Sequence, residues 1–251
     1  MSSLALDSAA LAARTILESS GETYRAEETA LRMCAAFHLQ NVQIIAFPTG
    51  FVLTATTENG HETRVFRIQE RNIRLDRIDA VNSISRLAVS GQLTAREACD
   101  QLVALRAQAS LPWWRTCLYY ALASAFFTVM FGGGAFEFLM SFVIGYLVQS
   151  LQIPLIRLNI PSQLQSFLLG FFSALSASLP LALFGGLQEA VITGVIMPLL
   201  PGLAMTNAVR DTIRGDLISG LARSAEALIS AILLSAGVAA ALFFWGKIWI
   251  V

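Results

Sequence analysis

The chain has 251 residues, 55% of them hydrophobic, and equal numbers of acidic and basic side chains, 17 of each. The charges are unevenly distributed: residues 1–115 hold 12 acids and 12 bases, whereas residues 116–251 hold five of each. This contrast predicts a soluble domain followed by a membrane domain. The balanced charge lacks the basic stripe typical of nucleic-acid-binding proteins, so we expect no nucleic acid partner.

Residues 1–110 are expected to form a small cytoplasmic α+β domain with the element order ααβββαα. Apolar residues recur at helical spacing in the first 40 residues, in two helices separated by Gly21. Three short strands of alternating polarity follow, and Asn59-Gly60 between the second and third is a strong hairpin signal. Two more helices complete the domain, and a capping box of Thr94 and Glu97 opens the second of them.

Residues 111–251 are expected to form an α-helical membrane domain of about five transmembrane helices. The expected spans are 113–131, 136–151, 163–184, a broken span over 187–206, and 225–249. Arginines accumulate at the helix ends that lie on the side of the soluble domain, which predicts a cytoplasmic N-terminus and an external C-terminus. These arginines are Arg106, Arg115, Arg157, Arg210, Arg214 and Arg223, against Lys247 at the other side.

Small residues recur every four positions in the third and fourth expected spans, with Gly170 and Ala174 in one and Gly194 in the other. Such stripes let helices approach closely, so we expect these two spans to pack together. Glu137 and Glu189 each follow a glycine turn at a helix start. A carboxylate is favourable at that end of a helix, and capping is the expected role of both.

No sequence pattern indicates catalysis. Lys247 is the only lysine, so a GxxxxGK[ST] phosphate-binding loop is absent, and so are HExxH and GxSxG motifs. His38 and His61 have no second histidine at ligand spacing, and the three cysteines are far apart. We therefore expect a protein that is not an enzyme and that uses neither a cofactor nor a metal.

The fourth expected span is interrupted in its second half. An apolar run that begins near Glu189 is broken by Pro198, Pro201 and Gly202 before the chain turns polar. In hydrocarbon each freed backbone N–H or C=O costs several kcal/mol, so such a break is tolerated mainly where the backbone is buried in protein or lines a wet cavity. The break therefore indicates a place of functional interest.

Polar side chains follow this break. Asn207 and Asp211 are four residues apart and share a helical face. An ionisable side chain beside a discontinuous span is a candidate for a solute or ion pathway. The alternative is that Asp211 lies beyond the membrane in a cytoplasmic loop, paired with Arg210 or Arg214. The candidate substrate or proton pathway comprises Pro201, Gly202, Asn207, Arg210, Asp211, Arg214 and Asp216.

Four motifs give the chain a family resemblance: GETYR at 21–25, PTG at 48–50, VNSISR at 81–86 and PGLAMTNAVRDTIRGD at 201–216. With them the chain resembles the N-terminal half of the threonine/serine exporter family over nearly its whole length. The resemblance implies a secondary exporter that is driven by the proton gradient and moves threonine and serine out of the cell. A short-chain branch of similar length is associated with succinate export and works with a separate small membrane subunit.

Long members of that family continue into a second membrane half that this chain lacks, which implies a partner subunit, a homo-oligomer or both. We expect a subunit of a proton-coupled exporter of small carboxylate-bearing metabolites in the bacterial inner membrane. The solute stays open, because Asp211 suits an ammonium group whereas Arg210 and Arg214 suit a dicarboxylate. The alternative is a membrane-anchored scaffold or sensor subunit without transport activity of its own, although a plain anchor needs no helix break.

Overall fold

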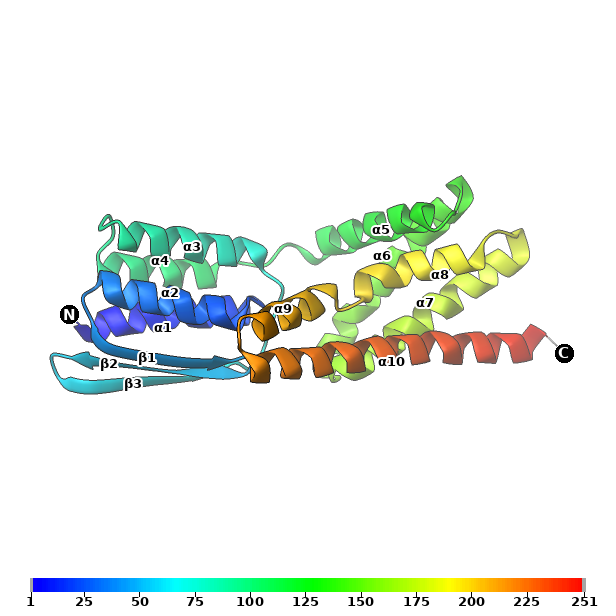
Figure 1. The fold of residues 1–251 in the computed structure, drawn as a ribbon. Helices are drawn as coiled ribbons and strands as arrows, with labels where there is room; N and C mark the ends of the chain where they lie inside the picture. The colour runs from blue at the N-terminus through cyan, green and yellow to red at the C-terminus, as the bar shows by residue number, and fades with distance from the viewer. Residues whose placement is uncertain (1, 250–251) are drawn as a thin grey trace. The chain divides into compact units, whose positions relative to one another are not determined.

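The computed structural model describes residues 2–249 and divides them into two compact units (Figure 1). The first unit contains the described residues up to Ala109 together with Leu203–Ser224. The second contains Ser110–Gly202 and the described residues from Ala225 onward. The grouping of Leu203–Ser224 with the N-terminal residues is not apparent in the sequence pattern.

The first unit has the predicted element order ααβββαα, followed much later in the chain by one further helix. Its three strands form an antiparallel sheet of order β1-β2-β3, as predicted. Helices α1 and α2 pack against the sheet, and α3 and α4 lie on the same side of it, beyond α1 and α2 (Figure 1). The elements are α1 (Ser2–Glu18), α2 (Thr23–Ala36), β1 (Gln40–Phe47), β2 (Gly50–Thr57), β3 (Gly60–Arg67), α3 (Leu75–Val89), α4 (Ala95–Ala107) and α9 (Gly202–Ile213).

Helix α1 is the centre of this unit and contacts α2, α3, α4, β2 and β3. Leu6, Ile16 and Leu17 of α1 are fully buried, and its many alanines let the neighbouring elements approach closely. Full burial of each large apolar side chain contributes about 1.5–3 kcal/mol. The predicted capping box is confirmed, because Glu97 N donates to Thr94 Oγ1 at 3.3 Å and Thr94 N donates to Glu97 Oε2 at 2.8 Å.

The second unit is helical. It contains α5 (Trp113–Met130), α6 (Ala135–Arg157), α7 (Ser162–Phe184), α8 (Gln188–Ile196), the short 3₁₀ helix η1 (Met197–Leu199) and most of α10 (Leu217–Trp249).

Among the described residues, three helices are long and apolar enough to cross a membrane: α6, α7 and Leu217–Lys247 of α10. A fourth span results if Gln188–Leu199 and Gly202–Ile213 count together as one broken span. Helix α5 is not among these candidates. It begins with Trp113, Trp114 and the charged Arg115. The predicted membrane segment is thus confirmed as three or four candidate spans, and the count of five stays a prediction.

Two helix boundaries differ from those expected. Helix α6 runs through Pro154 to Arg157 instead of ending at 151. A proline inside a helix removes one backbone hydrogen bond and can kink the helix without ending it. Helix α10 begins at Leu217 instead of 225, which places Arg223 within the helix.

The predicted break in the fourth span is present at η1. Helix α8 ends at Ile196, so the carbonyls of its last turn lack α-helical donors. The hydroxyl of Tyr120 on α5 donates to one of them, the carbonyl of the fully buried Val195, at 2.7 Å. A side chain from a neighbouring helix therefore satisfies backbone that the break leaves open.

Replacement of Tyr120 with phenylalanine is expected to lower the free energy of unfolding by about 1–3 kcal/mol, because a buried carbonyl then loses its donor. The measurement is the thermal unfolding midpoint of the purified protein in detergent. Tyr119→Phe is the control, since Tyr119 is 56% exposed. Equal midpoints for the two variants would show that the Tyr120 bond does not stabilise the break.

The small-residue stripes lie against different helices from those expected. A Cβ atom on Gly170 would lie 2.3 Å from the Leu234 carbonyl oxygen of α10, and one on Gly194 would lie 1.9 Å from Thr128 Oγ1 of α5. Helices α7 and α8 do contact each other, as predicted. However, Gly170 lies where α7 meets α10, and Gly194 lies where α8 meets α5. Gly170 therefore allows close packing of α7 on α10 within this chain.

Glu137 has the predicted capping role at the start of α6, and it also binds the backbone just before α8. Its carboxylate accepts a hydrogen bond from Gly134 N at 2.8 Å, at the start of α6. The same carboxylate accepts from Leu187 N at 3.1 Å, in the residue before α8. Glu189 lies in the first turn of α8.

Candidate functional site at the turn between the first two helices

Helix α9 presents one polar face to the turn between α1 and α2. Asn207 and Asp211 are 3% and 0% exposed, whereas Arg210 and Arg214, which flank this face of α9, are exposed. The prediction that Asn207 and Asp211 share a face is confirmed, because both bind the turn formed by Ser20–Thr23. This contact lies wholly within the first unit.

Asp211 caps the N-terminus of α2. Thr23, the first residue of that helix, donates its backbone N–H to Asp211 Oδ1 and its hydroxyl to Asp211 Oδ2, both at 3.1 Å. Glu22, the N-cap residue of α2, makes no side-chain capping bond itself. The first N–H groups of a helix have no partner within it, and a negative charge is favourable there. A residue 188 positions away in the sequence therefore supplies the missing cap.

The carbonyl groups of the same turn are bound by two further side chains. The chain leaves α1 through Ser20, which has a left-handed backbone with a φ of 61°. Asn207 Nδ2 donates to the Ser20 carbonyl at 2.9 Å, and Arg223 Nη2 donates to the Gly21 carbonyl at 2.7 Å. Asn207, Asp211 and Arg223 together satisfy three backbone groups of this turn.

Asp211 and Arg223 also form a buried ion pair. Arg223 Nε lies 3.1 Å from Asp211 Oδ2, and the side chains are 4% and 0% exposed. Two charges removed from water depend strongly on each other, so that loss of one partner typically costs about 3–5 kcal/mol. The pair therefore joins α9 to the first turns of α10, and removal of one member alone leaves the other charge buried without it.

Glu22 links this cluster to solvent-exposed arginines. Its carboxylate lies 2.7 Å from Arg210 Nη1 and 3.3 Å from Arg25 Nε. Burial alone would raise the pKa of Glu22, but hydrogen bonds and the positive charges of Arg210 and Arg25 lower that pKa below its ordinary value. Arg214 stacks over the Tyr24 ring at 5.2 Å from its centroid.

A further carboxylate lies one turn along α2 from Thr23. Glu27 Oε1 accepts a hydrogen bond from Ala46 N of β1 at 2.7 Å. Burial raises the pKa of Glu27 above its ordinary value, the bond from Ala46 lowers it, and the negative charges of Asp216 and Asp211 raise it. Glu27, Asp211 and Asp216 therefore act on one another electrostatically.

The predicted pathway residues are thus distributed as follows. Asn207 and Asp211 lie at the buried contact, Arg210 and Arg214 at its exposed side, and Asp216 directly before α10. Pro201 and Gly202 stand at the break and group with the second unit. The alternative in which Asp211 pairs with Arg210 or Arg214 is wrong about the partner, which is Arg223. A role of these residues in a solute or proton pathway stays a prediction.

Sequence reasoning missed three residues of this contact: Glu22, Thr23 and Arg223. A signal was present, because Glu22 and Thr23 belong to GETYR and Asp211 to PGLAMTNAVRDTIRGD, two of the motifs behind the family resemblance. The structure brings these two motifs into contact with each other. Spacing along the chain carries no information about such a pairing.

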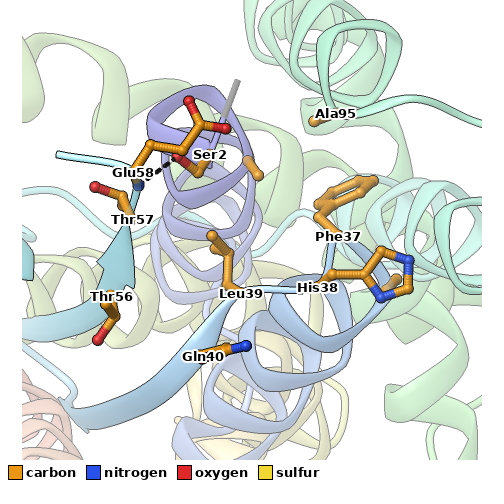
Figure 2. A pocket seen from close by; sticks show the side chains of 11 residues that line it. Ser2, Phe37, His38, Leu39, Gln40, Thr56, Thr57, Glu58 and Ala95 are labelled. Carbon is orange, nitrogen blue, oxygen red and sulfur yellow. Dashed lines mark hydrogen bonds between the residues drawn. The ribbon is translucent and has the colours of Figure 1, made fainter. Parts of the chain in front are cut away.

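A separate hollow of about 560 Å³ lies elsewhere in the first unit. Figure 2 shows Ser2 beside Glu58, with His38 at the end of α2, and Glu58 N donates to Ser2 Oγ at 3.1 Å. None of the described residues that line it belongs to the predicted pathway. Within residues 2–249, no group of three His, Cys, Asp or Glu side chains could hold a metal ion.

The three apolar helices, together with the bent pair Gln188–Leu199 and Gly202–Ile213, are typical of a multi-pass membrane protein. The chain belongs to the threonine/serine exporter family, ThrE, whose family model matches residues 7–245. The description of this family is that of a transporter.

Two curated proteins are similar to the chain over most of their lengths. Both are named "probable succinate transporter subunit YjjP". The protein from Escherichia coli K12 is 25% identical over 237 residues, which cover 92% of this chain and 91% of that protein. The protein from Klebsiella aerogenes is 25% identical over 238 residues, with 92% and 90% covered. No solved structure matches the chain.

Proposed function

We propose that the chain is a subunit of a proton-coupled exporter of small carboxylate-bearing metabolites in a bacterial inner membrane. Family membership supports the transport class, and the printed names of the two relatives support the role of a subunit. The observation that carries the proposal is the break at Met197–Leu199, followed directly by a helix that buries Asn207 and Asp211. A plain membrane anchor requires neither feature.

A succinate-like dicarboxylate is the first solute to test, with threonine and serine next. The Asp211 carboxylate is fully buried against Thr23 and Arg223 in this arrangement, so the ammonium group of a solute does not reach it. Arg210, in contrast, is 55% exposed and could bind a solute carboxylate if Glu22 released it. The name of the two relatives points to the same solute.

A second membrane chain, further copies of this chain or both complete the transport path. Three or four candidate spans leave little room for the repeated halves that many secondary transporters use to alternate access. The relatives carry the word subunit in their names, which supports a heteromeric assembly.

The N-terminus and the loop after α6 are proposed to face the cytoplasm, because arginines gather there. In cells, a single cysteine in place of Arg157 should react with a membrane-impermeant thiol reagent only after the membrane is opened. Reaction of that cysteine in intact cells would place the loop outside and reverse the proposed orientation.

Export itself is tested by solute efflux from cells that express this chain, a candidate partner subunit, or both. The cells are loaded with labelled succinate, threonine or serine. Efflux of one of these solutes should require both chains and should stop when a protonophore removes the proton gradient. Efflux that continues with the protonophore would exclude proton coupling. Equal efflux with the partner alone would support the alternative, a scaffold or sensor subunit without transport activity of its own.

A further inference from the structure

Helix α9 is fixed to its unit by side chains that are almost all polar. Its buried residues are Asn207, Ala208 and Asp211, so a single alanine is its only buried apolar side chain. Helix α1 buries ten residues in the same unit, including Leu6, Ile16 and Leu17. Polar groups can exchange their protein partners for water at a small net cost, whereas buried apolar groups cannot. Among the described helices of this unit, α9 is therefore suited to detach without unfolding the core.

Both ends of α9 are connected by segments that allow such a movement. Leu200 and Pro201 separate it from η1 on one side. On the other side the chain reverses through Gly215, which has a φ of 92° and where an added Cβ would meet no atom within 4 Å. Helix α9 is joined to the break at η1 by only two residues.

We propose that the contact between α9 and the α1–α2 turn is a latch that opens during export, with Thr23 and Arg223 as positioning residues that hold Asp211 in the closed state. This inference rests on the proposed export function. Thr23 fixes both carboxylate oxygens of Asp211, at 3.1 Å each, and so sets the orientation of α9 on the turn. Arg223 supplies the opposite charge and stays bound to the Gly21 carbonyl of the same turn.

Opening is measured by the thiol reactivity of the Ala208→Cys variant, because Ala208 is fully buried on α9. Cys34 is the matched internal control, because it is fully buried in the core of the same unit. The latch predicts that the thiol introduced at position 208 reacts with a small maleimide much faster than Cys34. Equal rates would mean that α9 leaves only when the whole unit unfolds, and would overturn the latch.

Positioning by Thr23 is tested in the same background. Thr23→Val removes the hydroxyl bond to Asp211 and should accelerate labelling at position 208 about two- to tenfold, with no change at Cys34. Thr23→Ser keeps a hydroxyl and should restore the original rate. A purely structural role would move both cysteines together. If Ala208→Cys does not fold, hydrogen exchange of the unaltered protein replaces the labelling experiment. The amides of α9 should then exchange far faster than those of α1. Equal protection of the two helices would overturn the latch.

The link to export is tested by adding succinate, threonine or serine to membranes that contain the chain and its partner subunit. The exported solute should change the labelling rate at position 208 but not at Cys34. An unchanged rate in membranes that do export would overturn the latch while the proposed function stands. Fast labelling at position 208 in membranes that export none of the solutes would overturn both the proposed function and the latch as a step of export. Helix α9 would then be a detachable helix without a role in export.

Discussion

Asp211→Asn is expected to release α9 from the α1–α2 turn in most molecules. Asparagine keeps the volume but leaves the buried guanidinium of Arg223 without the Asp211 carboxylate. Loss of one partner of a buried pair typically costs about 3–5 kcal/mol, which corresponds to a hundredfold or larger shift towards the open form. Hydrogen exchange should show α9 amides losing protection while α1 amides keep it. Unchanged protection of α9 would contradict the buried pair.

A comparison substitution removes an ion pair with one exposed member from the same contact. Arg210→Met separates Arg210, whose side chain is 55% exposed, from Glu22, whose side chain is 6% exposed. Glu22 keeps Arg25 Nε at 3.3 Å, so its charge stays paired and the protection of α9 should fall less than with Asp211→Asn. Similar effects of Arg210→Met and Asp211→Asn would show that burial does not distinguish these two ion pairs.

A double substitution separates a structural role of Asp211 from a role in proton transport. Replacement of both members of a buried pair by residues of similar volume is often neutral, so Asp211→Asn with Arg223→Met should recover part of the protection of α9. The remaining loss is about 1–3 kcal/mol, because the buried Gly21 carbonyl loses its Arg223 donor. If Asp211 carries a proton during export, the double variant stays inactive although α9 is closed. If export returns, Asp211 serves only to hold α9.

The features that the sequence predicted correctly have local causes. Alternation of polarity and Asn59-Gly60 predicted the antiparallel sheet, and the Thr94 and Glu97 capping box predicted a helix start. Pro198 predicted the break, because proline has no backbone N–H to donate to the carbonyl one turn earlier in the helix. The four-residue spacing of Asn207 and Asp211 predicted their common face.

The features that the sequence did not predict depend on contacts between distant segments. Thr23 and Asp211 are 188 residues apart, and helical periodicity cannot show which turn a polar face will meet. The sequence pattern places Arg223 just before a last span that starts at residue 225, whereas α10 begins at Leu217 and contains Arg223. The assignment of Gly170 to the packing of α7 on α8 failed for a similar reason, since a small residue permits close approach without choosing the partner.

Gly194→Ala is expected to disturb the second unit strongly, by forcing α5 and α8 apart. The added Cβ would lie 1.9 Å from Thr128 Oγ1 and 2.7 Å from Thr128 N, so rotation of the threonine side chain alone does not remove the clash. The Thr128 hydroxyl is also held, 2.9 Å from the Ser124 carbonyl oxygen and 2.6 Å from Ser141 Oγ. Overpacking in a tight interior typically costs about 1–3 kcal/mol.

The measurement is the thermal unfolding midpoint in detergent, with Gly246→Ala in α10 as the matched control. A Cβ on Gly246 meets no atom within 4 Å, and alanine is the better helix former, so this variant should unfold at the same temperature or higher. Adding Thr128→Ala to Gly194→Ala should recover only part of the loss, because the clash with the backbone of Thr128 remains. Equal midpoints for Gly194→Ala and Gly246→Ala would show that α5 and α8 are not in the close contact that supports the break.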